Sequence, residues 1–290
     1  MGLAIGDALG VPMENKRKGS IDFVSEMLGG GANSLPPGAW TDKTAIALCL
    51  AQSLLVTSEL DVYDLVTRLK KWVETGENSS TGICTGVEQN LLRWLRSFQR
   101  KKQIDMGFPT QPDDGKSVIA RVCPVACIHW TDLATVSRIS RQQSYLTHTS
   151  EIIATSCEYL ALSVSHLIAG RDWNYVCNMP MKKDWPYEIR RIIEGTWRYK
   201  KIHDLNTSDG IVDLLEAAFW CSENSTNYEE AVTTAINLGG SSETIGSVVG
   251  QIAGAMYGLE SIPVRWFDQL VHVEKLTDVA MEMVDLSRSE

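Results

Sequence analysis

The chain of 290 residues has no run of about 18 consecutive apolar residues, the length that a membrane-spanning helix requires. It carries no recognisable secretory signal, which favours a cytoplasmic protein. Its formal net charge is −9, so it lacks the surplus of basic side chains that a nucleic-acid-binding surface requires. We therefore expect neither a membrane nor a nucleic acid as its partner.

The seven cysteines form no metal-binding or disulfide pattern. Their number is odd and they are scattered along the chain, with Cys123 and Cys127 as the closest pair. No C-x-x-C motif occurs, which argues against a zinc ribbon and against a disulfide scaffold. This use of cysteine agrees with a reducing compartment.

Alternation of apolar and polar residues, the mark of β-strands, is nowhere sustained, and neither a tandem repeat nor a flexible linker divides the chain. Helical periodicity dominates instead, and irregular structure is expected at 28–40, 103–117 and 174–186. Helices are expected over 41–57, 61–75, 86–101, 118–129, 132–142, 150–169, 187–200, 211–221 and 228–238. We predict a single all-α domain over residues 1–290.

The stretch 237–263 predicts the central helix of this domain. A polar turn with Gly239 and Gly240 leads into an apolar helix that either Ser241 or Ser242 can cap at its N-terminus. Glycine then recurs at every fourth position, which places one glycine stripe along the helix and predicts close packing against another helix. The stripe consists of Gly246, Gly250, Gly254 and Gly258.

Polar side chains occur at two places where the surrounding sequence is small and apolar. Glu243 and Thr244 lie in the first turn of the central helix, where a metal or a phosphate could bind; the alternative is a plain capped core helix. Asp7 lies among small apolar residues near the start of the chain. A buried aspartate needs partners, so Asp7 is either a hydrogen-bond acceptor in helix packing or a group that orients a ligand.

Five segments together resemble the ADP-ribosylglycohydrolase family, and most closely its dinitrogenase-reductase-activating branch. The segments are 2–14, 38–55, 120–126, 146–156 and 235–266, and they occur in the family's order. The resemblance implies an orthogonal helical bundle around a cleft that holds two divalent cations, usually magnesium or manganese. It also implies hydrolysis of the bond that joins ADP-ribose to arginine, serine or another acceptor.

The two metal-binding motifs of the family are altered in this chain. The family's Thr/Ser-Asp-Asp-Thr reads Thr-Asp-Lys-Thr at 41–44, and its GGDxDT reads GGSSET at 239–244. The altered positions of this degenerate metal site are Thr41, Asp42, Lys43, Ser241, Glu243 and Thr244.

The charges of these motif residues bear on metal binding. Four family aspartates balance two divalent cations, whereas Asp42, Glu243 and Lys43 leave a net charge of −1. We expect the Lys43 ammonium to replace one cation and to pair with both carboxylates. In that case the chain needs no metal cofactor. In the alternative, Lys43 points outward and one magnesium or manganese ion binds to the remaining motif residues, Thr41, Asp42, Glu243 and Thr244.

The resemblance also assigns positions that touch the ligand. The family's loop GNGxxMR reads GKSVIAR at 115–121. The ligand-binding candidates are Glu14, Lys116, Ser117, His148, Gly239 and Gly240. The acidic catalytic position that the family has before the helix 86–101 finds no clear match; the nearest residues are Asn78 and Ser80, so the catalytic residue stays unassigned.

Three functions are compatible with these residues. The first is a non-hydrolysing protein that binds ADP-ribose, an ADP-ribosylated protein or another protein partner. The second is an active ADP-ribosyl hydrolase that uses one metal or an altered site. The third is a scaffold that no longer recognises a nucleotide.

Overall fold

The computed structural model describes residues 1–20, 22–101, 115–180, 182–208 and 210–289, and the protein is all-α, as predicted. Within these ranges β-structure is confined to isolated bridge residues. The α-helices are α1 (Gly2–Gly10), α2 (Asp42–Thr57), α3 (Val62–Thr75), α4 (Gln89–Lys101), α5 (Lys116–Ala120), α6 (Cys123–His129), α7 (Leu133–Tyr145), α8 (Glu151–Ile168), α9 (Trp173–Cys177), α10 (Tyr187–Ile193), α11 (Ile211–Glu223), α12 (Tyr228–Ile236), α13 (Ser242–Tyr257), α14 (Val264–Gln269) and α15 (Val273–Ser289). Short 3₁₀ turns are Val11–Met13, Thr196–Tyr199, Ile202–Asp204 and Leu259–Ser261. None of the described helices is both long and apolar enough to cross a bilayer.

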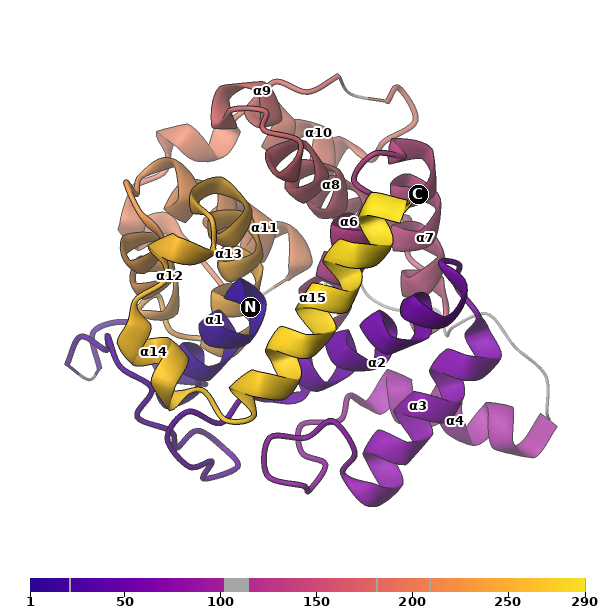
Figure 1. The fold of residues 1–290 in the computed structure, drawn as a ribbon. Helices are drawn as coiled ribbons and strands as arrows, with labels where there is room; N and C mark the ends of the chain where they lie inside the picture. Colours follow the sequence, from indigo (N-terminus) through magenta and orange to yellow (C-terminus); the bar gives the residue numbers. More distant parts are fainter. Residues whose placement is uncertain (21, 102–114, 181, 209, 290) are drawn as a thin grey trace.

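Helices α1 and α13 pack backbone against backbone and form the centre of the fold (Figure 1). A Cβ atom on Gly6 would lie 2.0 Å from the carbonyl oxygen of Gly246, and one on Gly250 would lie 2.1 Å from that of Gly2. No real Cβ atom tolerates such a distance, so only glycine fits at these positions. The predicted close contact along the first half of the stripe is therefore present.

The prediction of close packing is wrong for the second half of the glycine stripe, Gly254 and Gly258. The nearest atom to a Cβ on Gly254 would be 3.6 Å away, which is an ordinary contact. Gly258 does not belong to the helix: it is the C-cap of α13, with φ of +78°. The central helix thus ends at Tyr257, because glycine readily adopts this positive φ where the chain turns.

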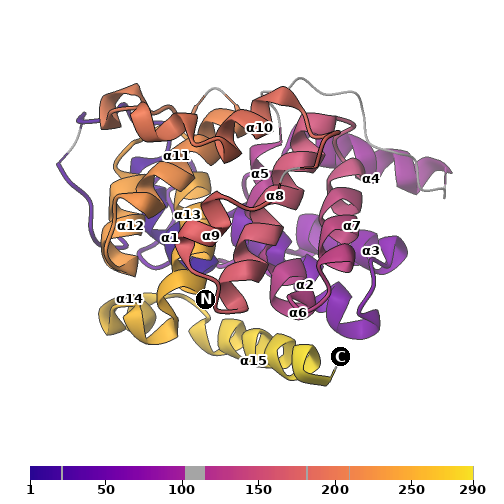
Figure 2. The same ribbon diagram turned by 90° about the horizontal axis from the view of Figure 1, so that it is seen from above.

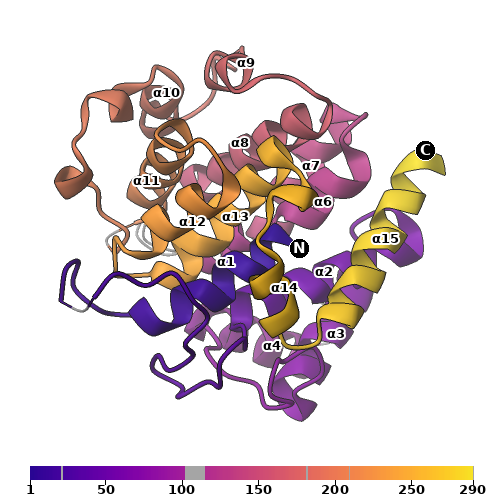
Figure 3. The ribbon, with the colours of Figure 1, turned by 60° about the vertical axis from the view of Figure 1, so that its left-hand side comes forward.

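Helix α15 covers one face of the molecule. It crosses in front of α2 and α6 in Figure 1, and seen from above it forms the outer edge beside them (Figure 2). Figure 3 shows that the N-terminus of the chain lies on the same side, beside α13. One large cluster of buried side chains runs from α1 to α15, which positions the N-terminal ends of α2 and α13 close to each other.

Several predicted boundaries differ from the observed ones. Helix α4 begins at Gln89 rather than at residue 86, and the expected helix 187–200 divides into α10 and a 3₁₀ turn. A short helix, α9, lies across the start of the segment 174–186 that was predicted to be irregular. Of the predicted loop 103–117, residues 103–114 lie outside the described residues. No helix was predicted for the residues of α15.

Candidate functional site

The candidate site lies where the N-terminal ends of α2 and α13 meet. Helix α1 leads to it, since a Cβ atom on Gly10 would lie 2.4 Å from the carbonyl oxygen of Ser242. Ser241 is the N-cap of α13, but its side chain makes no capping hydrogen bond. The Ser242 hydroxyl instead donates to the carbonyl oxygen of Gly10 at 2.7 Å. Neither predicted serine cap is therefore made by a side chain, and Ser242 joins α13 to α1.

Asp7 of α1 holds the first turn of α2 in place. Its carboxylate accepts hydrogen bonds from the backbone N–H and hydroxyl of Thr41, at 3.0 and 2.7 Å, and from those of Thr44, at 3.0 and 2.6 Å. Complete burial raises the pKa of Asp7 to about 6, although these hydrogen bonds act to lower it. These bonds join α1 to α2, as the predicted packing role requires; they also fix the orientation of Thr41, a motif residue, and the role of orienting a ligand stays a prediction.

Lys43 pairs with carboxylates from both helices. Its Nζ lies 2.7 Å from Oδ1 of Asp42 and 3.6 Å from Oε1 of Glu243. The three side chains are 12%, 3% and 9% exposed, so the cluster is almost closed to water. Burial would lower the pKa of Lys43, but the two carboxylates raise it above its ordinary value, and the ammonium therefore keeps its charge. Burial raises the pKa of Asp42 to about 7, against the opposing effect of Lys43.

The segment before α4 approaches Asp42 at a position that the sequence did not single out. A Cβ atom on Gly86 would lie 2.7 Å from Oδ1 of Asp42. Neither Asn78 nor Ser80, the residues nearest to the expected acidic position, bonds to Asp42 in the described part of the chain. Lys275 donates to Oδ1 of Asn78 at 2.7 Å, and Ser80 donates to a backbone carbonyl at the same distance. Position 86 therefore faces the site, and as glycine it supplies no carboxylate.

His148 lies beside this segment and forms part of a polar pocket. Its Nδ1 is 2.8 Å from the Thr147 hydroxyl, and its Nε2 is 3.8 Å from Oε2 of Glu88. The buried guanidinium of Arg121 also contacts Thr147, at 3.4 Å, and so supports the position of His148. The pocket has a volume of about 370 Å³ and is lined by Glu88, Gln89, Asn90, Arg93 and His148. Of these five residues, only His148 was predicted from the sequence. The other four belong to none of the segments that resemble the family.

The Gly239–Gly240 turn is held by the segment that follows Glu14. Both glycines have positive φ, +76° and +64°, and Gly240 exchanges backbone hydrogen bonds with Asn15 and Lys16, at 2.8 and 2.9 Å. One carboxylate oxygen of Glu14 accepts from the backbone N–H of Ala32 at 2.7 Å. Glu14 therefore ties the 28–40 segment to this turn.

Lys116 and Ser117 begin α5, which packs against both α2 and α13. The Lys116 ammonium donates to the carbonyl oxygen of Ser208 at 2.5 Å. The Ser208 hydroxyl lies only 2.3 Å from where a Cβ on Gly240 would be. Ser117 is buried, and in the described part of the chain its hydroxyl has no hydrogen-bond partner. The two predicted ligand positions thus lie on the same side of the site as the glycine turn.

The family model described as ADP-ribosylglycohydrolase matches residues 1–290. The chain belongs to the ADP-ribosylglycohydrolase family. It is 32% identical over its whole length to ADP-ribosylarginine hydrolase Tri1 of Serratia proteamaculans, of which it covers 79%. It is 27% identical to the ADP-ribosyl-[dinitrogen reductase] glycohydrolase of Rhodospirillum rubrum, with 93% of this chain and 88% of the relative aligned. A solved structure titled ADP-ribosylglycohydrolase-related protein complex has a TM-score of 0.83 at 30% identity, covering 99% of this chain and 95% of that one.

The residues at the family's metal positions are a poor fit for two divalent cations. Asp42 Oδ2 and Glu243 Oε2 are buried and have no hydrogen-bond partner among the described residues, so each carboxylate has one oxygen left for a ligand. The other oxygens face the Lys43 ammonium, which repels a metal ion. Within the described residues, no group of three or more His, Cys, Asp or Glu side chains could hold a metal ion. The donor set therefore lacks both the charge and the number of ligands that a two-metal centre requires.

Proposed function

We propose that this family member binds ADP-ribose or an ADP-ribosylated protein and does not hydrolyse it by two-metal chemistry. The observation that carries the proposal is the Lys43 ammonium, which lies between Asp42 and Glu243. It supplies a fixed positive charge where the family motifs would hold a cation. A binding site is compatible with that charge. An ammonium group, however, does not activate a water molecule for hydrolysis as a bound metal ion does. The same proposal leaves the protein without a metal cofactor.

The chemistry of the neighbouring surfaces supports a phosphorylated sugar or nucleotide as the ligand. The pocket that contains His148 is also lined by Arg93, and guanidinium groups bind phosphate through two parallel hydrogen bonds. Its volume of about 370 Å³ falls within the range of small-molecule sites. We place the protein in the cytoplasm as part of the same proposal, since all seven cysteines are unpaired.

Hydrolysis of ADP-ribosylated arginine is the second candidate. The relatives support it more directly than they support the first, because Tri1, at 32% identity, is named an ADP-ribosylarginine hydrolase. In this case Lys43 would leave the site and a single metal would bind to the oxygens of Asp42 and Glu243. The unpartnered oxygens Oδ2 and Oε2 are compatible with such a change.

Calorimetry with ADP-ribose, in the presence and in the absence of magnesium, separates these functions. The first candidate predicts binding that magnesium leaves unchanged, while the second predicts binding that strengthens with magnesium. Absence of binding under both conditions would contradict both and favour a scaffold. Arg93→Gln should weaken binding by at least about tenfold, because it removes the charge-assisted hydrogen bonds of the guanidinium. Arg96→Gln is the matched control, since Arg96 is an exposed residue of the same helix outside the pocket and should leave the affinity unchanged.

An activity assay tests independently whether the protein hydrolyses ADP-ribosylated arginine. The unmodified protein is incubated with ADP-ribosylated arginine and either magnesium or manganese, and released ADP-ribose is measured. The proposal predicts no release above the uncatalysed rate. Release that depends on metal and disappears in Asp42→Asn would overturn it in favour of the second candidate.

A further inference from the structure

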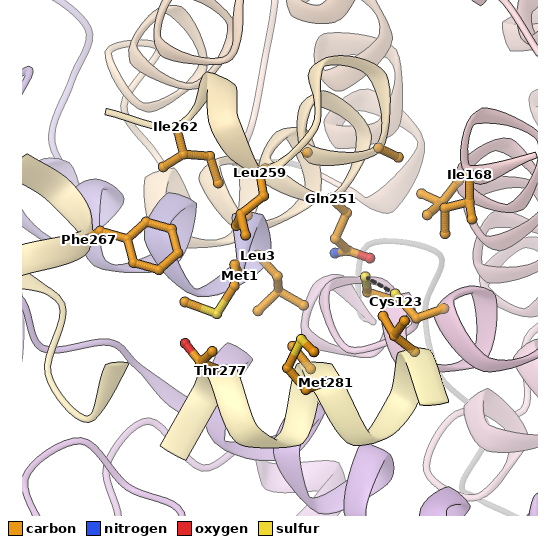
Figure 4. A pocket seen from close by; sticks show the side chains of 18 residues that line it. Met1, Leu3, Cys123, Ile168, Gln251, Leu259, Ile262, Phe267, Thr277 and Met281 are labelled. Carbon is orange, nitrogen blue, oxygen red and sulfur yellow. Dashed lines mark hydrogen bonds between the residues drawn. The ribbon is translucent and has the colours of Figure 1, made fainter. Parts of the chain in front are cut away.

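An apolar cavity lies along the C-terminal half of α13, between α15 and helices α1, α6 and α8. Its volume is about 290 Å³, almost twice the roughly 150 Å³ of an apolar cavity that binds benzene. Figure 4 shows Met281 of α15 and Gln251 of α13 on its walls. None of its 18 lining residues has a charged side chain. The cavity therefore suits an uncharged group about the size of a small aromatic ring.

Two thiols face this cavity from one turn of α6. Cys123 and Cys127 both line it, and their sulfur atoms lie 3.6 Å apart (Figure 4). Both residues are half-buried, whereas four of the other five cysteines are buried. The hydrogen bond between the two thiols raises the pKa of Cys123 and lowers that of Cys127, so Cys127 is the one that loses its proton more readily.

The helix makes a direct disulfide between these sulfurs unfavourable. Side chains four residues apart on a helix have Cβ atoms about 5–6 Å apart. A disulfide needs a Cβ–Cβ distance of about 3.5–4.5 Å, so closing it would unwind α6. A single bridging atom that bonds to both sulfurs spans the pair without this distortion.

The apolar wall of the cavity selects among bridging atoms. A cuprous ion held by two thiolates carries a negative charge, which the ammonium of Met1 at the cavity wall would offset, but a bare ion leaves the apolar cavity unfilled. Trivalent arsenic with one organic substituent forms two bonds to sulfur and gives a neutral product. Gln251 adds one polar group to the cavity wall, because its Oε1 is buried and has no hydrogen-bond partner within the described ranges.

We propose that Cys123 and Cys127 form a chelating dithiol site for trivalent arsenic that carries one apolar substituent, with the substituent held in the cavity. Each thiol gives up its proton, two arsenic–sulfur bonds replace the bonds to the oxide oxygen, and that oxygen leaves with both protons as water. Arsenic stays trivalent, so no oxidant or reductant is needed. Once the first bond forms, the second thiol reacts within the same molecule, which makes the chelate far more stable than a single bond.

This site is independent of the proposed ADP-ribose function. Gln251 follows Glu243 by eight residues on α13, which corresponds to about 12 Å along the helix axis. None of the residues in the two altered metal motifs, 41–44 and 239–244, lines the cavity. Failure of one proposal therefore leaves the other untouched.

Phenylarsine oxide is the probe that tests the dithiol site. The folded, reduced protein is treated with one equivalent, then with an excess of a monothiol, and intact mass is measured. We expect one phenylarsenic group per chain, retained against the monothiol, released by 2,3-dimercaptopropanol and accompanied by a rise in melting temperature. A rise is expected because the cavity exists only in the folded state.

Three serine variants locate the adduct. Cys123→Ser and Cys127→Ser should each lose retention against the monothiol, since each leaves one sulfur. Cys84→Ser is the matched control: Cys84 is the remaining half-buried thiol, and this variant should retain the adduct. Retention in a Cys123→Ser/Cys127→Ser double variant, loss in Cys84→Ser, absence of an adduct on the unmodified protein, or a lowered melting temperature would each overturn the proposal.

Discussion

The ammonium of Lys43, at the start of α2, lies 3.6 Å from the carboxylate of Glu243, at the start of α13. The same ammonium lies 2.7 Å from Asp42, its neighbour in the chain. Lys43 therefore links two helices that come from opposite ends of the sequence. Because the three side chains are almost closed to water, the charges interact strongly, and removal of one leaves the others without compensation.

Lys43→Met should reduce the free energy of unfolding by about 3 kcal/mol, since it leaves two buried carboxylates without a cation. The triple variant Asp42→Asn, Lys43→Met, Glu243→Gln should recover most of this loss, because no unpaired charge remains. Urea unfolding at pH 7 measures both. A loss below about 1 kcal/mol for Lys43→Met would mean that the cluster behaves as an exposed ion pair.

Gly250→Ala and Gly254→Ala should change stability in opposite directions. The new Cβ on residue 250 would meet the Gly2 carbonyl at 2.1 Å, so α1 must move away, at a cost of at least 1–3 kcal/mol by analogy with overpacked cores. The new Cβ on residue 254 has 3.6 Å of clearance. Alanine there should stabilise the helix by up to about 1 kcal/mol. Thermal unfolding of the two variants checks this, and equal melting temperatures would contradict the packing of α1 on α13. The larger substitution Gly250→Leu should be more severe still.

Asp7 should make the protein less stable as the pH rises from about 4 to 6. Burial raises its pKa from 3.8 to about 6, so the folded state binds the proton more tightly than the unfolded state does. The resulting stabilisation is fully present below about pH 4 and is lost as the pH rises through about 6, amounting to about 3 kcal/mol.

Asp7→Asn should lack this contribution, so that its unfolding free energy falls less between pH 4 and pH 7 than that of the unmodified protein. Urea unfolding across this range measures the difference. Asp268→Asn, which changes an exposed carboxylate on α14, is the control and should follow the unmodified protein. Parallel curves for Asp7→Asn and the unmodified protein would show that Asp7 has an ordinary pKa.

The sequence predicted those parts of the fold that depend on periodicity and small residues. The all-α class followed from helical spacing, and the contact of α13 with another helix followed from glycine at every fourth position. The predicted end of α13 was wrong, because a glycine that continues a spacing pattern and a glycine that ends a helix look the same in sequence. Helix α15 was missed, and it is the helix that closes the apolar cavity.

The candidate site was predictable where a motif carried it. The motif positions at 41–44 and 239–244 predicted that Lys43 meets Asp42 and Glu243, and the structure has both contacts. The proximity of Gly86 to Asp42 was not predicted, because a glycine outside any recognised motif has no side chain that indicates a site. Glu88 and Arg93 were missed for a related reason: they reach the pocket through the position of α4, which depends on tertiary packing.

The ion-pair geometry predicts what restoring the family's carboxylates would do. The triple variant Lys43→Asp, Ser241→Asp, Glu243→Asp should bind manganese, because it removes the ammonium and returns four carboxylates in the two motifs. Glu243 is shortened because its extra methylene displaces the carboxylate by about 1.5 Å, whereas a metal geometry tolerates about 0.5 Å. Thr41 and Thr244 already supply hydroxyl groups at their motif positions. Titration followed by manganese electron paramagnetic resonance measures the binding.

The double variant Ser241→Asp, Glu243→Asp isolates the part played by Lys43. It restores the α13 motif but keeps the ammonium beside Asp42, so we expect manganese binding far weaker than in the triple variant. The triple variant should still hydrolyse ADP-ribosylated arginine slowly. Position 86 gives no carboxylate beside Asp42, and Lys116 and Ser117 replace the Asn-Gly of the family's ligand loop. Equal manganese affinity in the double and triple variants would show that the Lys43 ammonium moves aside easily, and the proposed non-hydrolysing function would lose its main support.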